Sequence, residues 1–240
     1  MLSLLRKYMP LTIKHILNSI YVNSLSGYVL SKLYGNRIVI DNINIEINNK
    51  IINNLYYARI FLQKYERIEI AQIKKYLNPE IDTIELGCGI GITSANIIKK
   101  LNYKSRLFCL EANPDLCKIL KNHLNLNSKF NNYYIENKLK NYNKDNFFFK
   151  KDNQYLLSKV DENDNDGNSI EIESIKLNQL INKYNINEYN LVCDIEGSEI
   201  FILLNDSDVL KNCKTLIIEL HPIKYRNKEF QIQDIENLIL

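Results

Sequence analysis

The sequence predicts an α/β fold in which a central, mostly parallel β-sheet is covered by helices on both faces. Short apolar segments alternate with segments of helical periodicity from residue 83 onward, which is typical of parallel sheets. A glycine-rich turn, IELGCGIG at residues 84–91, joins the first apolar segment to a helix. The 240 residues are 45% hydrophobic and 25% charged, which suits one domain with an ample core and a short appendage.

Residues 1–57 are predicted to form a helical segment and a β-hairpin ahead of a main domain at residues 58–240. Isoleucines alternate over residues 38–47, interrupted by Asp41 and Asn42 at a turn. The apolar pattern of residues 1–35 is broken by Arg6, Lys7 and Pro10, so it reaches neither the roughly 18 residues of a membrane span nor a signal-peptide core. We expect a packed helical pair; the alternative is a basic amphipathic segment in peripheral contact with a membrane or a partner.

The main domain is predicted to begin with a helix at residues 58–77, which ends before a proline. Strands follow at 83–86, 106–110, 190–194 and 215–220, and helices at 92–101, 114–125 and 175–184. The pattern weakens between residues 130 and 174. The acidic run DENDNDGN at residues 161–168 is expected to be a solvated loop, because it lacks the terminal glutamate and the ligand spacing of a calcium loop.

Charge and cysteine content exclude several classes of protein. The 31 basic and 28 acidic residues leave a net charge of +3, too small an excess to indicate nucleic-acid binding. Five cysteines occur without a CxxC pair. Buried thiols in a reducing compartment, and therefore a cytoplasmic location, are favoured over disulfides or zinc.

The glycine-rich turn predicts a cofactor site. Its glycines permit a tight turn and close approach of a ligand to the backbone at a helix N-terminus. Ile92 stands where a dinucleotide-binding GxGxxG motif has its third glycine, and the GxGxG spacing favours S-adenosylmethionine over NAD. Glu85 suits the cationic amino-acid end of that cofactor. The candidate cofactor-binding residues here are Glu85, Gly87, Cys88, Gly89 and Gly91.

Glu111 ends the next apolar strand, 24 positions after Gly87. A carboxylate at this place accepts hydrogen bonds from both hydroxyls of a ribose. An acid after a strand is common, but a glycine-rich turn and an acid on consecutive strands together favour a nucleoside-containing cofactor. Ala112 and Asn113 complete the candidate cofactor-binding residues. The alternative is that the glycines only tighten a turn.

Two carboxylates, Asp194 and Glu196, end the apolar strand in VCDIEGSEIF at residues 192–201. Alternate side chains of a strand share a face, so both acids point the same way, which is unfavourable unless they bind something. Gly197 lets the chain turn away or approach a ligand. The structural alternative is that one acid caps a helix predicted at residues 198–204, but capping accounts for only one of the two.

His221 follows the next strand, in LIIELHP. The usual pKa of an imidazole suits a general base near neutral pH. Glu219 shares a face with His221 in an extended chain, where it can orient the ring. The alternative is a structural histidine that precedes a proline.

Taken in order, these segments resemble the blocks of the FkbM family of S-adenosylmethionine-dependent methyltransferases: IELGCGIGITSANIIKKL, LEANPDLCKILKNHLNLN, IESIKLNQLI, LVCDIEGSEIFIL and LIIELHP. The resemblance covers roughly residues 65–222, and the DIEG block is its most diagnostic part. The loop departs from the DxGAN pattern that is common in the family. The resemblance implies a Rossmann-like class I methyltransferase fold and methyl transfer to a hydroxyl of a sugar, a glycan or a similar small molecule.

Asp194, Glu196 and His221 are the candidate catalytic residues for that reaction. Transfer to a hydroxyl requires that the acceptor be aligned and its proton removed. Asp194 or His221 is the base, or Asp194 and Glu196 hold a divalent cation that lowers the pKa of the hydroxyl. Two other functions stay open: methylation of nitrogen or of a macromolecule, and a non-catalytic binding module that retains the fold.

The C-terminus departs from the class I pattern. Such enzymes usually close the sheet with a hairpin of two further strands, whereas only a helical pattern with Ile232 and Ile235 is visible after Pro222. The hairpin is therefore expected to be missing or shortened. Either the chain is truncated or the strand at residues 215–220 is covered in another way, since an uncovered apolar edge invites aggregation or pairing with another chain. A homodimer through that edge is a hypothesis.

Overall fold

The computed structural model describes residues 21–47, 51–140, 146–150, 159–161, 169–195, 199–205, 207–225 and 228–238. Contacts divide the chain into two compact units, Met1–Arg67 and Ile68–Leu240. The division into functional domains after residue 57 stays a prediction.

The first unit contains the predicted hairpin. Its elements are α3 (Ser24–Tyr34), β1 (Arg37–Ile40), β2 (Ile43–Glu46) and α4 (Asn54–Phe61). β1 and β2 pair in antiparallel fashion, and Asp41 and Asn42 between them adopt φ values of 50° and 64°, a left-handed conformation that both residue types tolerate in turns.

The predicted N-terminal helical pair is only partly visible, because residues 1–20 lie outside the described residues. Within the described part of the chain, no helix is long and apolar enough to cross a membrane. Peripheral membrane contact through this segment stays a prediction.

The single helix predicted at residues 58–77 is wrong. Two helices occupy this stretch, α4 and α5 (Arg67–Tyr76). Gln63 and Glu66 lie between them with φ values of 55° and 43°, and this left-handed backbone cannot continue a right-handed helix. The apolar period runs through the break, so the sequence pattern does not show it.

The second unit is built on a five-stranded, all-parallel sheet with the strand order β11-β10-β3-β4-β5. Its strands are β3 (Asp82–Leu86), β4 (Leu107–Leu110), β5 (Tyr133–Glu136), β10 (Tyr189–Cys193) and β11 (Cys213–Ile218). Four of them match the predicted strands within two residues. β5 was not predicted, because it lies at an edge of the sheet and mixes apolar with polar residues. β11 forms the opposite edge of this sheet, as predicted, and the homodimer through it stays a prediction.

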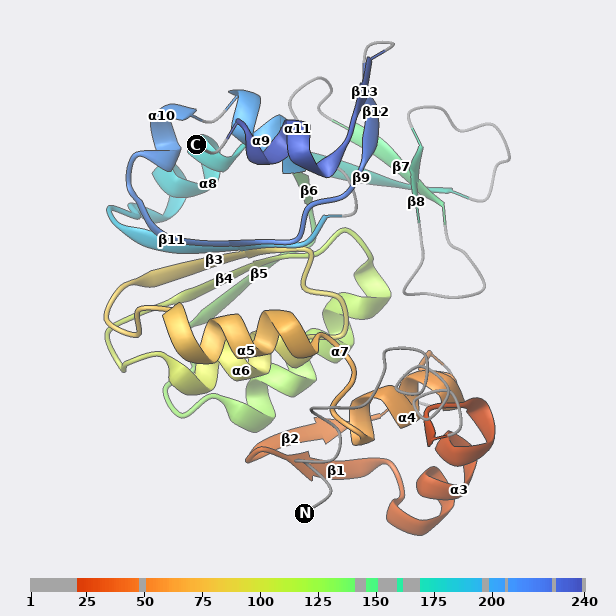
Figure 1. Ribbon diagram of the computed structural model, residues 1–240. Helices are drawn as coiled ribbons and strands as arrows, with labels where there is room; N and C mark the ends of the chain where they lie inside the picture. Colours follow the sequence, from red (N-terminus) through yellow and green to blue (C-terminus); the bar gives the residue numbers. More distant parts are fainter. Residues whose placement is uncertain are drawn as a thin grey trace, which may run out of the picture. The chain divides into compact units, whose positions relative to one another are not determined.

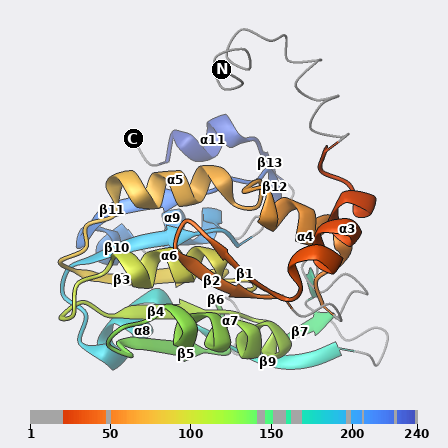
Figure 2. The ribbon, with the colours of Figure 1, turned by 90° about the horizontal axis from the view of Figure 1, so that it is seen from below.

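Helices cover both faces of this sheet, as the sequence predicts. α5, α6 (Ile92–Lys100) and α7 (Pro114–Asn127) lie on one face, and α8 (Leu177–Tyr184), α9 (Glu199–Asn205) and α10 (Ser207–Leu210) lie on the other (Figure 1). α6 and α7 run side by side, also when seen from below (Figure 2). Each face has its own apolar core: Ile84 and Leu86 pack toward α8 and α9, and Cys109 packs with α6 and α7.

Two smaller sheets accompany the main one. β6 (Leu139–Lys140), β7 (Asn146–Lys150), β8 (Lys159–Asp161) and β9 (Ser169–Ile175) form a four-stranded sheet in the region where the sequence pattern is weak. Residues 162–168 of the acidic run lie outside the described residues. After Pro222, β12 (Ile223–Tyr225) and β13 (Lys228–Phe230) pair as a short antiparallel hairpin, and the predicted helix follows as α11 (Ile232–Glu236). The C-terminal hairpin is thus shortened and separate from the main sheet.

The carboxyl ends of the main strands are joined by backbone hydrogen bonds one residue beyond each strand. The Gly87 amide donates to the Leu110 carbonyl at 3.0 Å, and the Asp194 amide donates to the Leu86 carbonyl at 3.0 Å. The Glu219 amide continues the series by donating to the Cys193 carbonyl at 2.9 Å. These bonds place the three predicted site segments side by side at the carboxyl ends of the strands, which is where parallel α/β sheets bind ligands.

Gly87→Ala is expected to lower the free energy of unfolding by about 3 kcal/mol or more, the sum of a left-handed φ and an overpacked contact. Gly87 has a φ of 82°, and an added Cβ would lie 1.7 Å from the carbonyl oxygen of Asp194. Gly35→Ala is the control for the backbone cost alone, since Gly35 has φ 70° and ψ −158° with nothing within 4 Å of an added Cβ; it should lose about 1 to 3 kcal/mol, the cost of a backbone region that is populated essentially by glycine. Denaturant titrations measure both losses, and equal losses would contradict the steric argument.

Candidate functional site

The glycine-rich loop connects β3 to α6 through three glycines with left-handed backbone. Gly87, Gly89 and Gly91 have φ values of 82°, 53° and 80°, which glycine adopts without steric penalty. The Gly91 amide donates to the Cys88 carbonyl at 2.8 Å and closes the turn. A Cβ on Gly91 would lie 2.7 Å from Cδ1 of Leu120, so this glycine also allows α6 to pack closely on α7.

His123 of α7 supports the same loop, which the sequence did not indicate. Its side chain is fully buried, and Nδ1 lies 2.6 Å from the carbonyl oxygen of Ile90. The contact fixes the loop backbone from the side of α7. A histidine inside an ordinary helical pattern gives no signal of such a contact.

Glu111 joins the loop to the start of α7. Its Oε2 accepts a hydrogen bond from the Gly89 amide at 2.7 Å, and its Oε1 accepts one from the Asn113 amide at 2.8 Å. Burial raises the pKa of the Glu111 carboxyl to about 7, against the lowering effect of these amides. A carboxylate has roughly four acceptor positions, so Glu111 keeps acceptor capacity beyond its bonds to these amides.

Asn113 and Ala112 complete the cofactor side that the sequence predicts. The Asn113 side chain accepts a hydrogen bond from the Asp115 amide at 3.0 Å and so caps α7, a structural role typical of asparagine at this position. The side chain of Asn137, which follows β5, donates to the backbone oxygens of Glu111 and Ala112, each at 2.9 Å. These contacts fix the backbone around Glu111.

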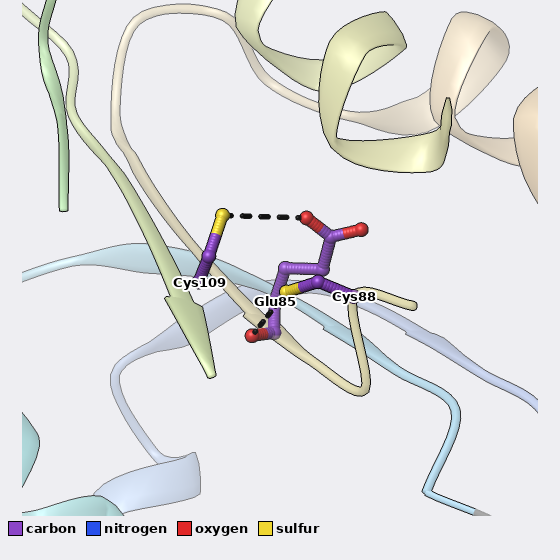
Figure 3. Close-up of side chains that lie close together, drawn as sticks. All are labelled: Glu85, Cys88 and Cys109. Carbon is purple, nitrogen blue, oxygen red and sulfur yellow. Dashed lines mark hydrogen bonds between the residues drawn. The ribbon is translucent and has the colours of Figure 1, made fainter. Parts of the chain in front are cut away.

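Glu85 lies in the interior of the domain. Its side chain is 1% exposed and is in register with Cys109 of β4 and Val192 of β10. The Sγ of Cys109 lies 3.7 Å from its Oε2, and the Sγ of Cys88 lies 3.6 Å from its backbone oxygen (Figure 3). The pKa of Glu85 is raised to about 8, mainly by burial and to a small extent by the charge of Glu111, against the lowering effect of hydrogen bonds from Ser94, Cys88 and Cys109. At neutral pH this carboxyl is therefore largely neutral.

The acceptor side brings together Asp194 and His221, the two described residues predicted for it. Asp194 follows β10 directly, and its backbone oxygen is the one against which Gly87 packs. The distance from Oδ1 of Asp194 to Nδ1 of His221 is 4.0 Å. Glu196 and Gly197 lie outside the described residues, so the predicted pairing of Glu196 with Asp194 stays a prediction.

Glu199 is a third member of this group, and the sequence analysis missed it. Its side chain is fully buried in the first turn of α9, where Oε1 lies 3.2 Å from Nδ1 of His221. The same oxygen accepts a hydrogen bond from the Ile195 amide at 3.0 Å. An acid at the start of a helix is common because it interacts favourably with the helix dipole. The sequence signal that could have assigned Glu199 to the site is its closeness in the chain to Asp194, five positions earlier.

Asp194, Glu199 and His221 also form a potential cation site. Each offers one ligand atom, and the three atoms lie within 4.8 Å of one another. Two carboxylates and an imidazole suit a divalent cation of the first transition series. Glu85, Cys88 and Cys109 meet the same distance criterion, but burial raises the pKa of all three groups, which opposes the deprotonation that ligation requires.

The fold and the site together define the class of protein. A parallel sheet flanked by helices, with a glycine-rich loop at its carboxyl edge, is a Rossmann-like methyltransferase fold. The Methyltransferase FkbM domain matches residues 85–240, which is more than half of the chain. The chain belongs to the FkbM methyltransferase family. Among proteins with curated functions, none matches the chain significantly.

The effect of Glu85→Gln on the free energy of unfolding is expected to depend on pH. Relative to the wild type, the variant should be about 3 kcal/mol more favourable at pH 8 than at pH 5. The folded protein keeps the Glu85 proton up to a pH of about 8, whereas the ordinary pKa is 4.5. Between these values the folded state binds more protons than the unfolded chain, so stability falls as the pH rises. The variant loses this contribution, while Glu111 keeps part of the dependence in both proteins.

Denaturant titrations at the two pH values measure this difference. Glu188→Gln is the control, because the Glu188 side chain is 56% exposed and its replacement should change stability little at either pH. An equal effect of Glu85→Gln at pH 5 and pH 8 would contradict the buried, proton-binding state of Glu85.

Proposed function

We propose that the protein is an S-adenosylmethionine-dependent O-methyltransferase that acts on a hydroxyl of a sugar, a glycan or a similar small molecule. One observation carries the proposal: the loop segment and the acid–histidine group adjoin at the ends of β3 and β10. Gly87 of the loop lies against the backbone of Asp194. A donor held at the loop and an acceptor held at Asp194 would therefore be neighbours.

The cofactor side fits S-adenosylmethionine in the arrangement of its polar groups. The loop presents backbone at the carboxyl edge, where Gly87 is exposed and Gly89 is half-buried. Glu111 retains acceptor capacity for both ribose hydroxyls while two amides hold its carboxyl in place. When bound there, the cofactor supplies an electrophilic methyl group on a sulfonium.

The acceptor side has groups that can orient a hydroxyl and remove its proton. The side chains of Asp194 and His221 are 20% and 26% exposed, so a small acceptor can reach both. Either the Asp194 carboxylate or the His221 imidazole accepts the proton as methyl transfer proceeds. A divalent cation held by Asp194, Glu199 and His221 is the alternative, and it would lower the pKa of the acceptor hydroxyl.

Binding of S-adenosylhomocysteine, the demethylated cofactor, is expected to tighten about tenfold from pH 6 to pH 8. Burial raises the pKa of Glu111 to about 7 in the free protein, and hydroxyl donors favour the ionised carboxylate. Binding therefore releases the Glu111 proton below this pKa. Glu111→Gln should bind about 10- to 100-fold more weakly at pH 8 and lose the pH dependence.

Calorimetric titrations in buffers of different ionisation enthalpy measure both the affinity and the released proton. Glu188→Gln, a surface substitution at the start of β10, should bind as the wild type does. An unchanged affinity in Glu111→Gln would contradict the assignment of Glu111 to the ribose.

Asp194→Asn is expected to lower methyl transfer at least 100-fold, within the range that a general acid–base or acceptor-positioning group contributes. Cofactor affinity should change little. The assay uses S-adenosylmethionine labelled in the methyl group and a panel of glycans and small hydroxyl compounds, with and without chelator. Asp208→Asn is the matched control, because the Asp208 side chain is 91% exposed.

The outcomes of this assay separate the alternatives. Loss of activity with chelator, restored by a divalent cation, would favour the cation over direct proton transfer. Label on amines alone would contradict transfer to oxygen. Full activity in Asp194→Asn would contradict the role of Asp194.

A further inference from the structure

Among the described residues of the second unit, three carboxylates lie within 4.0 Å of a ring nitrogen of His221. Glu199 is nearest, with Oε1 3.2 Å from Nδ1. Asp194 lies 4.0 Å from the same nitrogen, and Glu219 lies 3.8 Å from Nε2. Only the contact with Glu199 is within hydrogen-bond range. Of these three, the hydrogen-bond partner of His221 is thus Glu199 of α9, whereas the sequence suggested that Glu219 can orient the ring.

This contact decides which ring nitrogen carries the proton. The Oε1 atom of Glu199 already accepts a hydrogen bond from the Ile195 amide. Because Oε1 acts as an acceptor toward this amide, Nδ1 of His221 is assigned as the donor in the 3.2 Å contact. In the neutral imidazole the other nitrogen, Nε2, then has the lone pair.

The surroundings of Glu199 strengthen the effect. Its side chain is fully buried, and a charge that is shielded from water interacts more strongly with its neighbours. A carboxylate beside Nδ1 stabilises the imidazolium that forms when Nε2 accepts a proton. The Glu219 side chain, by contrast, is 55% exposed, so solvent screens its charge.

We propose that Glu199 is the positioning residue that makes Nε2 of His221 the general base for the acceptor hydroxyl. The inference rests on the proposed function and selects between the two bases that it leaves open. During transfer the hydroxyl proton moves to Nε2, the acceptor oxygen forms a bond to the methyl carbon, and the bond from that carbon to the cofactor sulfur breaks. Glu199 takes no proton from the acceptor in this step and acts only through its contact with Nδ1.

A purely structural role of Glu199 makes different predictions. Glu199 also accepts a hydrogen bond from the Ile195 amide, so its removal lowers stability under either interpretation. Replacement of Glu199 changes the tautomer of His221, its pKa and the pH dependence of the reaction only if Glu199 orients the imidazole and stabilises its protonated form. These three quantities are therefore the informative readouts.

The first test is NMR spectroscopy of the full chain labelled with ¹⁵N at its histidines, without cofactor or acceptor. The chain has three histidines, and the spectrum of His221→Gln identifies the resonances of His221. Two-bond ¹H–¹⁵N correlations should show neutral His221 with its proton on Nδ1. This test needs no substitution at Glu199, so it stands even if such a variant does not fold.

The second test compares Glu199→Gln with Glu199→Asp and Glu219→Gln. Glu199→Gln should lower the pKa of His221 by about one unit, since an adjacent opposite charge is removed, and should allow the Nε2–H tautomer. It should also lower kcat about 10- to 100-fold, leave the KM of the acceptor within about twofold, and shift the acidic limb of the pH profile downward. Glu199→Asp should restore part of each effect, and Glu219→Gln should leave the tautomer unchanged.

Three results would overturn the inference. A proton on Nε2 in the wild type would exclude Nε2 as the base. An unchanged tautomer and pKa in Glu199→Gln would assign Glu199 to structure alone. An Nδ1–H signal that emerges only after chelator treatment would make Nδ1 a metal ligand. A wild type that shows the Nδ1–H tautomer but no methyl transfer would contradict the proposed function and, with it, the role of Nε2 as the base. The contact between Glu199 and Nδ1 would still stand.

Discussion

The site depends on the close approach of two backbones at the ends of β3 and β10. Gly87 packs so tightly on the carbonyl of Asp194 that a side chain there would overlap it. At the same place the Asp194 amide donates a hydrogen bond to the Leu86 carbonyl. Because the strands are parallel and adjacent, this contact places the glycine-rich loop and Asp194 side by side at the carboxyl ends of the strands, where we propose that the methyl donor and the acceptor bind. Other features of the site, such as the capped start of α7 and the buried Glu199 of α9, position groups around this contact.

The buried carboxyls differ in their partners, and the partners account for their roles. Glu85 is surrounded by thiols and apolar side chains, so burial leaves it largely neutral at pH 7. Glu111 is also buried but accepts two amide hydrogen bonds, and the pKa of its carboxyl is correspondingly closer to the ordinary value. A group that is half ionised near neutral pH responds to a hydroxyl donor more than one that is held neutral. Glu111 is therefore better suited than Glu85 to contact a cofactor.

The fold and the position of the glycine-rich loop within it could be predicted from the sequence, because both depend on local patterns. Strand–helix alternation and three glycines in eight residues have few structural meanings. The contacts of Glu199 and His123 could not be predicted in this way. Each joins residues 22 or 33 positions apart in the chain, and each residue fits an ordinary helix. The break before α5 could not be predicted for another reason. Gln63 and Glu66 interrupt the helix with left-handed backbone, and no glycine or proline marks the place in the sequence.

The central claim is that one edge of the sheet holds the cofactor beside the acceptor groups. Hydrogen–deuterium exchange of the full chain, with and without S-adenosylhomocysteine, tests it most directly, because it locates binding without knowledge of the acceptor. The account predicts slower amide exchange in two segments, the loop at residues 86–92 and the segment at residues 111–117, with a smaller change at residues 193–195. Binding with protection elsewhere and none in these segments would contradict it.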